Sequence, residues 1–275
     1  MSATSLRGRR IAITGAGRGI GLATAIALHG RGATVIIGDL DLDSATAAAT
    51  TVGPGTEAYP LDVSDYESFA AFHKEATAHA PLDVLINNAG IMPIGRFLAQ
   101  PADRHRRAVE INVMGCINGM HLALPAMVER GRGHVINIAS SAGKTPVPGG
   151  LTYCGTKAAV IALTETARVE YAGTGVQFTC VMPSFTNTEL IAGTSGLKFI
   201  PTAQPDDVAE AIVAAVMRPT ADVFVPKIIG PILRTQPLIG RRLRDAINTQ
   251  LGAYNTFLDF DPKARAEYQH RIDES

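Results

Sequence analysis

The sequence predicts a doubly wound α/β domain, in which a seven-stranded, mainly parallel sheet carries helices on both faces. Short apolar runs of strand length alternate with longer segments of helical periodicity along most of the 275 residues. The short runs are nearly continuous in Val, Ile and Leu, which is typical of parallel strands buried on both faces. No repeat, linker or low-complexity block interrupts the alternation, and 46% of the residues are hydrophobic, so we expect one large core.

The elements follow one another in a regular order. Seven apolar runs are predicted strands, at residues 10–14, 34–38, 57–62, 82–87, 134–139, 176–182 and 222–226. Six segments between them are predicted helices, at residues 20–31, 41–51, 64–79, 102–129, 152–172 and 206–217. Ser64 and Glu67 predict a capping box at the start of the third helix, because each side chain can reach the backbone N–H of the other.

The pattern changes after about residue 230. Three prolines within residues 226–237 argue against both a helix and a central strand there. A C-terminal amphipathic helix is then expected from one apolar stripe: Ile239, Leu243, Ile247, Leu251, Tyr254 and Leu258. The stripe can dock on the body of the protein or on a partner subunit. Contact with a membrane surface is the alternative, because basic residues accompany the stripe: Lys227, Arg234, Arg241, Arg242 and Arg244.

Composition argues against several classes of function. The 25 basic and 25 acidic residues cancel, whereas a nucleic-acid-binding domain carries a basic excess, so we expect no nucleic-acid partner. Three separated cysteines form neither a disulfide framework nor a zinc motif, and the histidines lack ligand spacing, so no metal is predicted. The N-terminal residues lack the apolar core of a secretory signal, and no run reaches about 18 apolar residues. We therefore expect a cytoplasmic protein without a membrane span.

A glycine-rich loop, TGAGRGIG at residues 14–21, connects the first predicted strand to a helix. Glycines let the backbone approach a ligand closely, and a helix N-terminus offers free N–H groups to a pyrophosphate. This order of strand, loop and helix is typical of a dinucleotide site. The spacing of Gly15, Gly17, Gly19 and Gly21 departs from the simple GxGxxG pattern, so a tight turn that merely needs glycine stays open as an alternative at this point.

The second predicted strand ends at Asp39, 18 residues after Gly21. A carboxylate at the tip of this strand can accept hydrogen bonds from the hydroxyls of an adenosine ribose, and it repels a 2′-phosphate. Asp39 therefore favours NAD over NADP. Arg18 argues the other way, because a cation in the loop can contact that phosphate, but Asp39 faces the position where the two cofactors differ. Asp39 can also cap the following helix, which is compatible with ribose binding.

Tyr153 and Lys157 lie four residues apart at the start of the predicted helix 152–172, so they share one face. A nearby ammonium favours the charged form of a tyrosine and lowers its pKa from the usual value near ~10. Such a tyrosine can exchange protons near neutral pH, as a general acid/base must. An ordinary surface pair is the alternative, because this spacing is common.

The loop, the acid, the Tyr–Lys pair and three further segments together resemble the short-chain dehydrogenase/reductase family. The resemblance covers about residues 8–230 and implies a Rossmann-type fold. The serine of this family falls three residues after the asparagine of INIAS, which selects Ser140 over Ser141. The other family motifs are matched, in chain order, by Thr14, Gly15, Gly19 and Gly21, by Asp62 and Val63, by Asn87, Asn88, Ala89 and Gly90, by Asn112, and by Tyr153 and Lys157.

The resemblance implies hydride transfer between a nicotinamide and a carbonyl or alcohol carbon. Tyr153 would be the acid/base, and Lys157 would stabilise its phenolate and hold the nicotinamide ribose. Ser140 would donate a hydrogen bond to the substrate oxygen. Asn112 would position a water for proton relay through the lysine.

The resemblance also implies a cofactor site and an assembly. Residues 1–230 would form the NAD-binding and catalytic domain, and residues 231–275 an extension packed on the same domain or on a partner subunit. Helices 102–129 and 152–172 would pair in a homodimer or homotetramer. The cofactor residues would be Gly15, Arg18, Gly19, Ile20, Gly21, Asp39, Asp62, Val63, Asn88, Ala89, Gly90, Tyr153, Lys157, Pro183 and Thr188. The sequence departs from the family pattern at Ser184. The family has a glycine after the proline that corresponds to Pro183, and a serine in its place can reshape the loop.

For the substrate site, the sequence predicts only that the lining is mostly apolar. Segments 91–98 and 144–151 would supply apolar walls, and segment 187–205 a mobile lid with apolar Ile191, Leu197, Phe199 and Ile200. We expect a small-molecule substrate, namely a hydrophobic secondary alcohol or ketone such as a sterol, a retinoid or a lipid-derived compound. The alternative is that these residues merely pack the lid. Two alternative functions stay open. One is an NADP-dependent carbonyl reductase, and the other is a non-catalytic NAD(H)-sensing protein, although the intact set of Asn112, Ser140, Tyr153 and Lys157 argues against the second.

Overall fold

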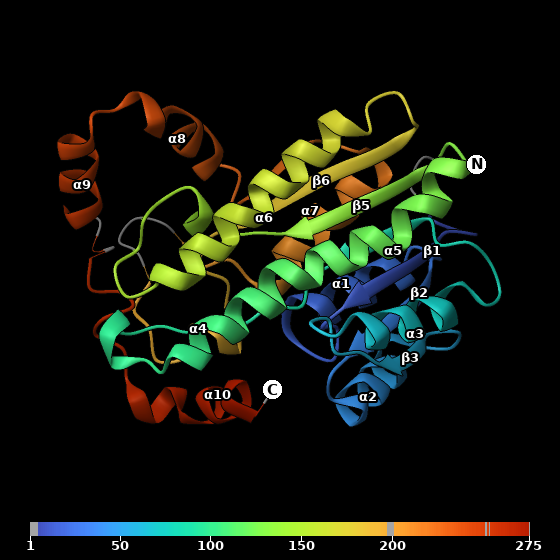
Figure 1. The fold of residues 1–275 in the computed structure, drawn as a ribbon, viewed down its shortest axis with the longest axis horizontal. Coiled ribbons are helices and arrows are strands. Elements are labelled where there is room, and N and C mark those ends of the chain that lie inside the picture. Colours follow the sequence, from blue (N-terminus) through green and yellow to red (C-terminus); the bar gives the residue numbers. More distant parts are fainter. Residues whose placement is uncertain (1–4, 197–200, 251, 253, 275) are drawn as a thin grey trace.

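The structure is a computed structural model, and it describes residues 5–196, 201–250, 252 and 254–274. One seven-stranded sheet, in the order β3-β2-β1-β4-β5-β6-β7, forms its centre, and every neighbouring pair of strands is parallel (Figure 1). All seven predicted strands are confirmed. They are β1 (Arg10–Thr14), β2 (Thr34–Asp39), β3 (Glu57–Pro60), β4 (Val84–Asn87), β5 (Gly133–Ile138), β6 (Val176–Pro183) and β7 (Asp222–Val225).

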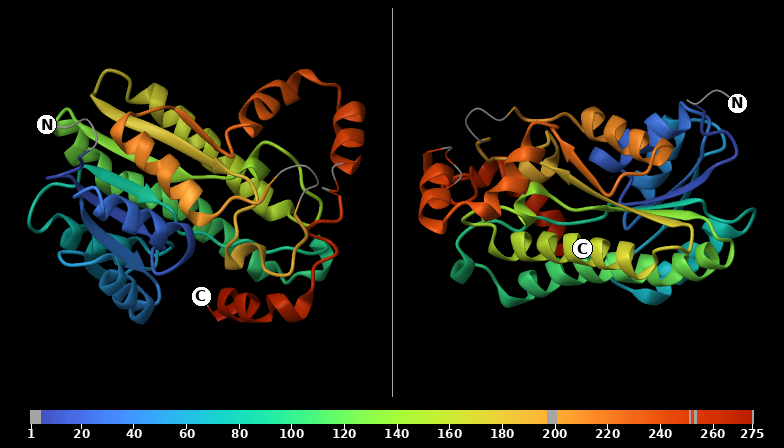
Figure 2. Two further views of the ribbon diagram at one scale, coloured as in Figure 1. Left: turned by 180° about the vertical axis from the view of Figure 1, so that it is seen from behind. Right: turned by 90° about the horizontal axis from the view of Figure 1, so that it is seen from above.

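Helices cover both faces of the sheet, as predicted for a doubly wound fold (Figure 2). One face is covered by α1 (Gly19–His29), α2 (Leu42–Val52) and α7 (Pro205–Met217). The other face is covered by α3 (Tyr66–Thr77), α5 (Gly115–Glu129) and α6 (Leu151–Glu170). Short turns of 3-10 helix lie at η1 (Phe97–Ala99), η3 (Ser141–Gly143) and η4 (Glu189–Ile191).

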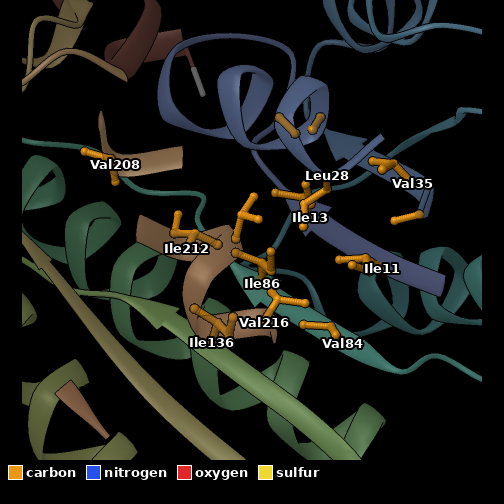
Figure 3. Packing of buried hydrophobic residues seen from close by; sticks show 14 of the residues in the cluster. Ile11, Ile13, Leu28, Val35, Val84, Ile86, Ile136, Val208, Ile212 and Val216 are labelled. Carbon is orange, nitrogen blue, oxygen red and sulfur yellow. The ribbon is translucent and has the colours of Figure 1, made fainter. Parts of the chain in front are cut away.

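Two apolar cores lie on the two faces because strand side chains alternate between them. In β1, Ile11 and Ile13 face the side of α1 and α7, whereas Ala12 faces α3 and α5. Figure 3 shows Leu28 of α1 and Ile212 of α7 packing toward the same layer. Full burial of a side chain of this size contributes roughly 1.5–3 kcal/mol, so these layers hold the strand ends in place.

The predicted helix 102–129 is one continuous stretch with a change of hydrogen-bond period in the middle. α4 (Ala102–Val109) leads into a π-helical turn, η2 (Glu110–Met114), and α5 follows directly. Within the described residues, this stretch is the one helix long and apolar enough to cross a membrane by length and composition, and 56% of its apolar window is buried inside the fold. Its apolar face packs on the sheet, which is the behaviour of a core helix.

The predicted capping box of α3 is wrong. Asp65 is the N-cap residue, and its carboxylate accepts a hydrogen bond from the backbone N–H of Glu67 at 2.9 Å. The Ser64 hydroxyl donates instead to Asp62 at 2.6 Å. Aspartate and serine are equally good caps, so the sequence alone does not separate two adjacent candidates.

The proline-rich segment forms a helix, contrary to the sequence prediction. α8 (Ile229–Thr235) contains Pro231 at its third position, and a 3-10 turn, η5 (Gln236–Leu238), continues it. The first four N–H groups of a helix have no partner within it, so a proline there removes no hydrogen bond. The prolines therefore limit the length of the helix rather than prevent it.

The expected C-terminal helix is shorter than predicted. α9 (Arg241–Gln250) stops before Gly252, whose φ of +80° suits a glycine that ends a helix. The predicted stripe therefore does not continue to Leu258 on one helix, and Leu251 lies outside the described residues. A further helix, α10 (Pro262–Glu274), has no counterpart among the predicted elements.

The pairing of helices 102–129 and 152–172 across a subunit interface stays a prediction. Four apolar side chains on these helices are exposed in the single chain, and they are Val109, Met114, Leu151 and Val169. A partner copy bound there would cover them.

His134 of β5 is a buried titratable group in the sheet. Thr179 donates its hydroxyl hydrogen to the carbonyl of Thr220 at 2.6 Å, so it accepts from the Nε2–H of His134 at 2.8 Å. The other ring nitrogen, Nδ1, is buried without a hydrogen-bond partner among the described residues. Burial, with a smaller effect from the charge of Arg9, lowers the pKa of His134 from 6.5 to about 4.

We predict that His134 makes the fold sensitive to acid. Its pKa is lower in the folded than in the unfolded chain, so its contribution to stability is complete above pH 6.5 and is lost as the pH falls toward about 4. The loss amounts to up to about 3 kcal/mol. Urea unfolding at several pH values measures it, and His134→Gln should flatten the pH dependence. The matched variant His79→Gln, at an exposed histidine, should keep the wild-type slope. Identical slopes for wild type and His134→Gln would contradict the prediction.

Candidate active site

A cavity of about 610 Å³ lies at the carboxyl ends of the strands. Residues that end or follow at least six different strands line it, namely Gly15 after β1, Asp39 of β2, Asp62 after β3, Ala89 after β4, Ser140 after β5 and Pro183 of β6. The sheet order reverses between β1 and β4, and the crevice at such a reversal is where doubly wound folds bind ligands.

The glycine loop and the segment after β4 are held together at this reversal. The Thr14 hydroxyl oxygen accepts hydrogen bonds from the backbone N–H groups of Asn88 and Ala89, both at 3.0 Å. The Asn88 amide nitrogen donates to the carbonyls of Thr14 and Gly15, both at 2.9 Å. Gly15 has a φ of +63°, and a Cβ there would lie 2.8 Å from the Ala89 Cα. The close approach of the two segments therefore requires glycine.

The start of α1 faces the cavity. Gly19, with a φ of +56°, and Ile20 line it, as predicted for a phosphate site. Among the described residues, no side chain caps this helix, so its first N–H groups stay available to a pyrophosphate. Gly21 lies behind the loop, where a Cβ would be 2.5 Å from the Gly15 carbonyl oxygen. Its absence of a side chain lets α1 pack closely on the loop.

Asp39 lies at the tip of β2 and lines the cavity. Its carboxylate accepts hydrogen bonds from the backbone N–H of Gly17 at 2.8 Å and of Asp41 at 3.2 Å. Asp41, rather than Asp39, is the N-cap of α2 and accepts from the Ser44 N–H at 3.1 Å. Asp39 is thus held by the glycine loop itself.

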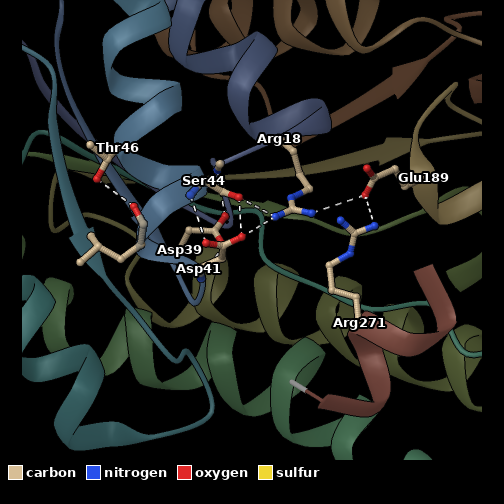
Figure 4. Close-up of polar contacts among 9 residues, drawn as sticks. Arg18, Asp39, Asp41, Ser44, Thr46, Glu189 and Arg271 are labelled. Atoms are coloured by element: carbon tan, nitrogen blue, oxygen red, sulfur yellow. Dashed lines mark hydrogen bonds and ion pairs between the residues drawn. The ribbon is translucent and has the colours of Figure 1, made fainter. Parts of the chain in front are cut away.

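Arg18 belongs to a chain of charged groups at the cavity (Figure 4). Its guanidinium contacts the Asp41 carboxylate at 2.9 Å and the Ser44 hydroxyl at 2.8 Å. Glu189 of η4 lies 3.8 Å from the other side of Arg18 and 2.8 Å from Arg271 of α10. Four of these groups, Arg18, Asp41, Glu189 and Arg271, line the cavity. The chain connects the glycine loop, the segment after β6 and the C-terminal helix.

Asp62 and Val63 line the cavity on its adenine side, as the resemblance implies. Asp62 accepts hydrogen bonds from the backbone N–H and the hydroxyl of Ser64, and Arg107 lies 3.5 Å away. Burial alone would raise the pKa of Asp62, but the hydrogen bonds from Ser64 and the charge of Arg107 outweigh it and lower that pKa. Asp62 is therefore an ionised acceptor at neutral pH.

The predicted catalytic groups Tyr153, Lys157 and Ser140 are buried and line the same cavity. Tyr153 and Lys157 lie one turn apart on α6, and the Lys157 ammonium is 5.8 Å from the centre of the tyrosine ring. Lys157 donates to the Ile138 carbonyl at 2.8 Å. Ser140 accepts from the Ala142 N–H at 3.1 Å, which fixes the serine at the start of η3.

The expected lowering of the Tyr153 pKa does not occur in the protein alone. Burial raises the pKa of Tyr153 far above its usual value, and a hydrogen bond with Ser140 opposes the rise only in part. Burial also lowers the pKa of Lys157, although the nearby thiols of Cys116 and Cys180 oppose this. Both groups are thus taken out of water, and burial is the largest cause of both pKa shifts.

Asn112 lies in the π-helical turn and is buried. Its amide nitrogen donates to the Ile91 carbonyl at 2.9 Å and to the Thr156 hydroxyl at 3.0 Å, and its oxygen accepts from the Ile91 N–H at 2.8 Å. A Cβ on Gly90 would lie 3.1 Å from the Asn112 oxygen and 3.4 Å from the Lys157 nitrogen. Asn112 and Lys157 therefore flank Gly90, but Asn112 is not among the described residues that line the cavity. Its role with a relay water stays a prediction.

The loop after β6 contains the departure from the family pattern. Pro183, Ser184 and Thr188 all line the cavity. The Ser184 backbone N–H donates to the Val225 carbonyl at 2.8 Å, which ties the loop to β7. The Ser184 hydroxyl oxygen is buried and has no hydrogen-bond partner among the described residues. It offers a polar contact at the end of the cavity next to Ser140, whose hydroxyl lies 3.5 Å from the Pro183 carbonyl.

The sequence analysis did not find the contribution of α10. Arg265 is buried and donates to the carbonyls of Leu190 at 2.8 Å and Ala192 at 3.2 Å. Its other nitrogen donates to the Met92 carbonyl at 2.6 Å, and its guanidinium lies 4.6 Å from the Tyr268 ring centre. The Tyr268 hydroxyl oxygen in turn accepts from the Met92 N–H at 2.8 Å. These partners lie 75 and 173 residues from Arg265 along the chain, so no local pattern predicts the contact.

The substrate side of the cavity is mostly apolar. The predicted wall segments contribute Ile91 and Met92, and Thr145 and Val147, and the predicted lid segment contributes Leu190 and Ile191. Leu197, Phe199 and Ile200 of the expected lid lie outside the described residues. The C-terminal region supplies further lining that the sequence analysis did not predict, and it consists of Ile229, Ile232, Leu233, Gln236, Phe257, Tyr268, Arg271 and Ile272.

The family follows from a comparison with known families. A family model described as short chain dehydrogenase matches residues 9–195. The chain belongs to the short-chain dehydrogenase family.

Two curated members of the short-chain dehydrogenase family illustrate the likeness in sequence. The probable oxidoreductase EphD of Mycobacterium tuberculosis is 36% identical over 232 residues, covering 76% of this chain and 39% of that protein. This chain thus spans about two fifths of the length of that relative. Estradiol 17-beta-dehydrogenase 11 of Homo sapiens is 26% identical over 269 residues, covering 95% of this chain and 89% of that protein.

Two solved structures of short-chain dehydrogenases share the fold. The 3-ketoacyl-(acyl-carrier-protein) reductase from Brucella melitensis, complexed with NADH, has a TM-score of 0.73 and 28% identity, covering 80% of this chain and 98% of that one. The gluconate 5-dehydrogenase from Burkholderia cenocepacia, in complex with NADP and tartrate, has a TM-score of 0.71 and 27% identity, covering 81% of this chain and 95% of that one. Members of the family thus bind either nicotinamide cofactor.

We predict that Glu189 contributes to cofactor affinity in this dehydrogenase. Glu189→Gln removes the charge that holds Arg18 and Arg271 together, which loosens the segment after β6. NADH fluorescence titration should show affinity about two- to fivefold weaker, because half-exposed ion pairs contribute up to about 1 kcal/mol each. Salt should weaken NADH binding less in the variant than in the wild type.

Glu210→Gln is the matched control for this variant. Glu210 of α7 pairs at 2.6 Å with Arg31, which follows α1, and neither is among the described residues that line the cavity. Its variant should bind NADH like the wild type. Unchanged affinity in Glu189→Gln, or an equal loss in both variants, would contradict a role for the chain of charges.

Proposed function

We propose that the protein is an NAD-dependent oxidoreductase that interconverts a secondary alcohol and a ketone. The proposal rests on the convergence of Tyr153, Lys157 and Ser140 on one buried cavity, into which the glycine loop also opens. Membership of the short-chain dehydrogenase family supports it, because the same residue types match the motifs of that family.

The residues present fit a nicotinamide dinucleotide. The contact between Gly15 and Ala89 leaves no room for a side chain beside the cavity, and the start of α1 has uncapped N–H groups within the described chain. The buried Ser184 hydroxyl, without a partner among the described residues, can hydrogen-bond an amide at the nicotinamide end. When bound, NAD supplies the hydride acceptor and a positively charged ring.

Each catalytic side chain then has one task. In alcohol oxidation, the Tyr153 phenolate takes the hydroxyl proton of the substrate, and Ser140 donates a hydrogen bond to the substrate oxygen. Lys157, oriented by the Ile138 carbonyl, places its charge near the phenol and the ribose. Burial raises the pKa of Tyr153 in the protein alone. The same buried, low-polarity environment strengthens the effect of any positive charge beside the Tyr153 phenol. Bound NAD would add such a charge to that of Lys157, and the two together would favour the phenolate.

Asp39 and Arg18 support NAD rather than NADP. Asp39 stays at the tip of β2, held by the Gly17 N–H, where its charge opposes a 2′-phosphate. Arg18, the cation that could favour such a phosphate, already contacts Asp41 and Glu189. An NADP-dependent carbonyl reductase remains the alternative, since structural neighbours bind NADH or NADP.

A hydrophobic substrate is supported by the lining of the cavity. Met92, Val147, Leu190 and Phe257 surround the space beside Tyr153. Arg265 donates to the backbone carbonyls of Met92 and Leu190 and is not among the described residues that line the cavity. An apolar wall binds a hydrocarbon skeleton through the area that it removes from water. Estradiol 17-beta-dehydrogenase 11 bears the name of a steroid, which agrees with this substrate class.

We predict NADH formation by the purified protein with NAD and apolar secondary alcohols, tested with a panel from small polyols to sterols. Tyr153→Phe should reduce turnover by about 10²-fold or more, because the acid/base is lost, while NADH binding is retained. Tyr66→Phe is the control, since Tyr66 is exposed and bonds only His121 among the described residues. Turnover of polyols alone would contradict the hydrophobic substrate. NADH binding without turnover on any alcohol would favour the NAD(H)-sensing protein.

We also predict that Asp39 sets the preference between cofactors. Asp39→Asn keeps an oxygen that can accept from the Gly17 N–H but removes the charge. The ratio of kcat/KM for NAD to that for NADP should exceed one in the wild type and fall about 10- to 100-fold in the variant. Asp43→Asn, on the exposed side of α2, should leave the ratio unchanged. A wild-type ratio below one would favour the NADP-dependent reductase.

A further inference from the structure

The segment 227–250, called the arm below, contains α8, η5 and α9. Figure 1 shows α8 and α9 standing out from the body of the fold, beyond the carboxyl ends of β5 and β6. Both further views in Figure 2 show the same placement, with the arm on the side of the molecule opposite to α2 and α3. The arm is therefore reachable from outside along most of its length.

α8 is apolar on two adjacent faces. Ile229 and Leu233, one turn apart, are buried against Phe224 and the end of β6. Ile228 and Ile232, also one turn apart, point outward and are 68% and 53% exposed. The single chain covers the face of Ile229 and Leu233 and leaves the face of Ile228 and Ile232 exposed.

The exposed apolar surface continues beyond α8. Leu238 at the end of η5 is 86% exposed, and Leu243 of α9 is 60% exposed. Ile247 lies one turn after Leu243 on the same face of α9 and is also exposed. Five exposed large apolar side chains within 20 residues of chain, Ile228, Ile232, Leu238, Leu243 and Ile247, are typical of a contact surface.

The arm is also strongly basic, although the whole chain is neutral. It contains five cations and one carboxylate, namely Lys227, Arg234, Arg241, Arg242, Arg244 and Asp245. Arg244 lies 3.5 Å from Asp245, and Arg234 lies 3.8 Å from Asp222 of β7. Within the described residues, Lys227, Arg241 and Arg242 form no ion pair. Cations without partners thus flank the exposed Leu243 and Ile228.

We propose that the arm docks on the surface of an anionic lipid bilayer. Apolar side chains flanked by Lys and Arg are the pattern of helices that lie in the membrane interface. Anionic lipids attract each such cation by about 1 kcal/mol near the surface, which for one residue is a roughly fivefold change in partitioning. A second copy of the chain is the less suitable occupant, because a two-fold contact through this arm would bring the same arginines together.

The docked arm would also place the cavity against the bilayer. Ile229, Ile232, Leu233 and Gln236 line the cavity, and Ile232 is at the same time half exposed on the outer face of α8. A lipophilic alcohol could then pass along α8 between bilayer and cavity without crossing water. This last step rests on the proposed function, whereas docking itself does not.

Vesicle flotation of the full chain tests docking without any turnover. The wild type should bind vesicles of phosphatidylcholine mixed with phosphatidylglycerol, bind pure phosphatidylcholine weakly, and lose binding as salt rises. Arg241→Gln and Arg242→Gln should each weaken binding about fivefold. The double variant Leu243→Ser/Ile247→Ser should abolish most of it, because both side chains leave the interface.

Two matched variants control for general effects of charge and exposure. Lys74→Gln on α3 and Leu42→Ser on α2 alter exposed residues far from the arm and should bind vesicles like the wild type. Thermal unfolding and turnover of a small water-soluble alcohol should be unchanged in all arm variants, which separates docking from folding and from catalysis.

The proposal would be overturned by a wild type that does not float with anionic vesicles, or by arm variants that float equally well. A size measurement completes the test. If Leu243→Ser/Ile247→Ser dissociates a dimer while the wild type ignores vesicles, the arm belongs to a contact between two copies. If the protein docks on anionic vesicles but turns over no alcohol, the role of the arm in docking is supported and only the proposed function is contradicted.

Discussion

One hydroxyl group holds together the two strand ends on which the site depends. Thr14 terminates β1, and its oxygen accepts the backbone N–H groups of Asn88 and Ala89 beyond β4. These strands are neighbours in the sheet but far apart in the chain, and the sheet order reverses between them. The glycine loop, Asp39 beside it and Gly90 in front of Lys157 all take their places from this junction. A dinucleotide would lie across it, because the crevice opens at the point of reversal.

Behind this junction, polar side chains in the core keep the catalytic region rigid. Asn87 donates to Asn137 at 2.8 Å, and Asn137 donates to Thr164 of α6 at 2.9 Å, so β4, β5 and the helix that carries Tyr153 are linked. Buried hydrogen bonds of this kind favour one arrangement of the elements, because breaking them would leave further polar groups unpaired. Tyr153 and Lys157 therefore lie on a helix that short, directional contacts join to the sheet.

The sequence predicted the strands and the glycine loop that lines the cavity, because both depend on local features. Continuous apolar runs mark buried strands, and the glycine loop needs its residue types at fixed spacing. Contacts between distant segments were not predictable in the same way. Arg265 on α10 carries no motif, and Pro231 argued against a helix that tolerates it in its first turn. Burial, too, is invisible locally, and it reverses the expected direction of the Tyr153 pKa.

Because α10 holds the cavity wall through Arg265, its position at the end of the chain affects the order in which the protein folds during synthesis. All seven strands precede α10 in the chain, so during synthesis the glycine loop and the sheet leave the ribosome before Arg265 does. Domains tend to fold as they emerge, starting from the N-terminal side. A nascent chain can therefore assemble its dinucleotide half while Met92 and the segment around Leu190 still lack the helix that holds them. Until α10 arrives, the apolar wall is open to water, and a chain interrupted there would present that surface to chaperones and proteases.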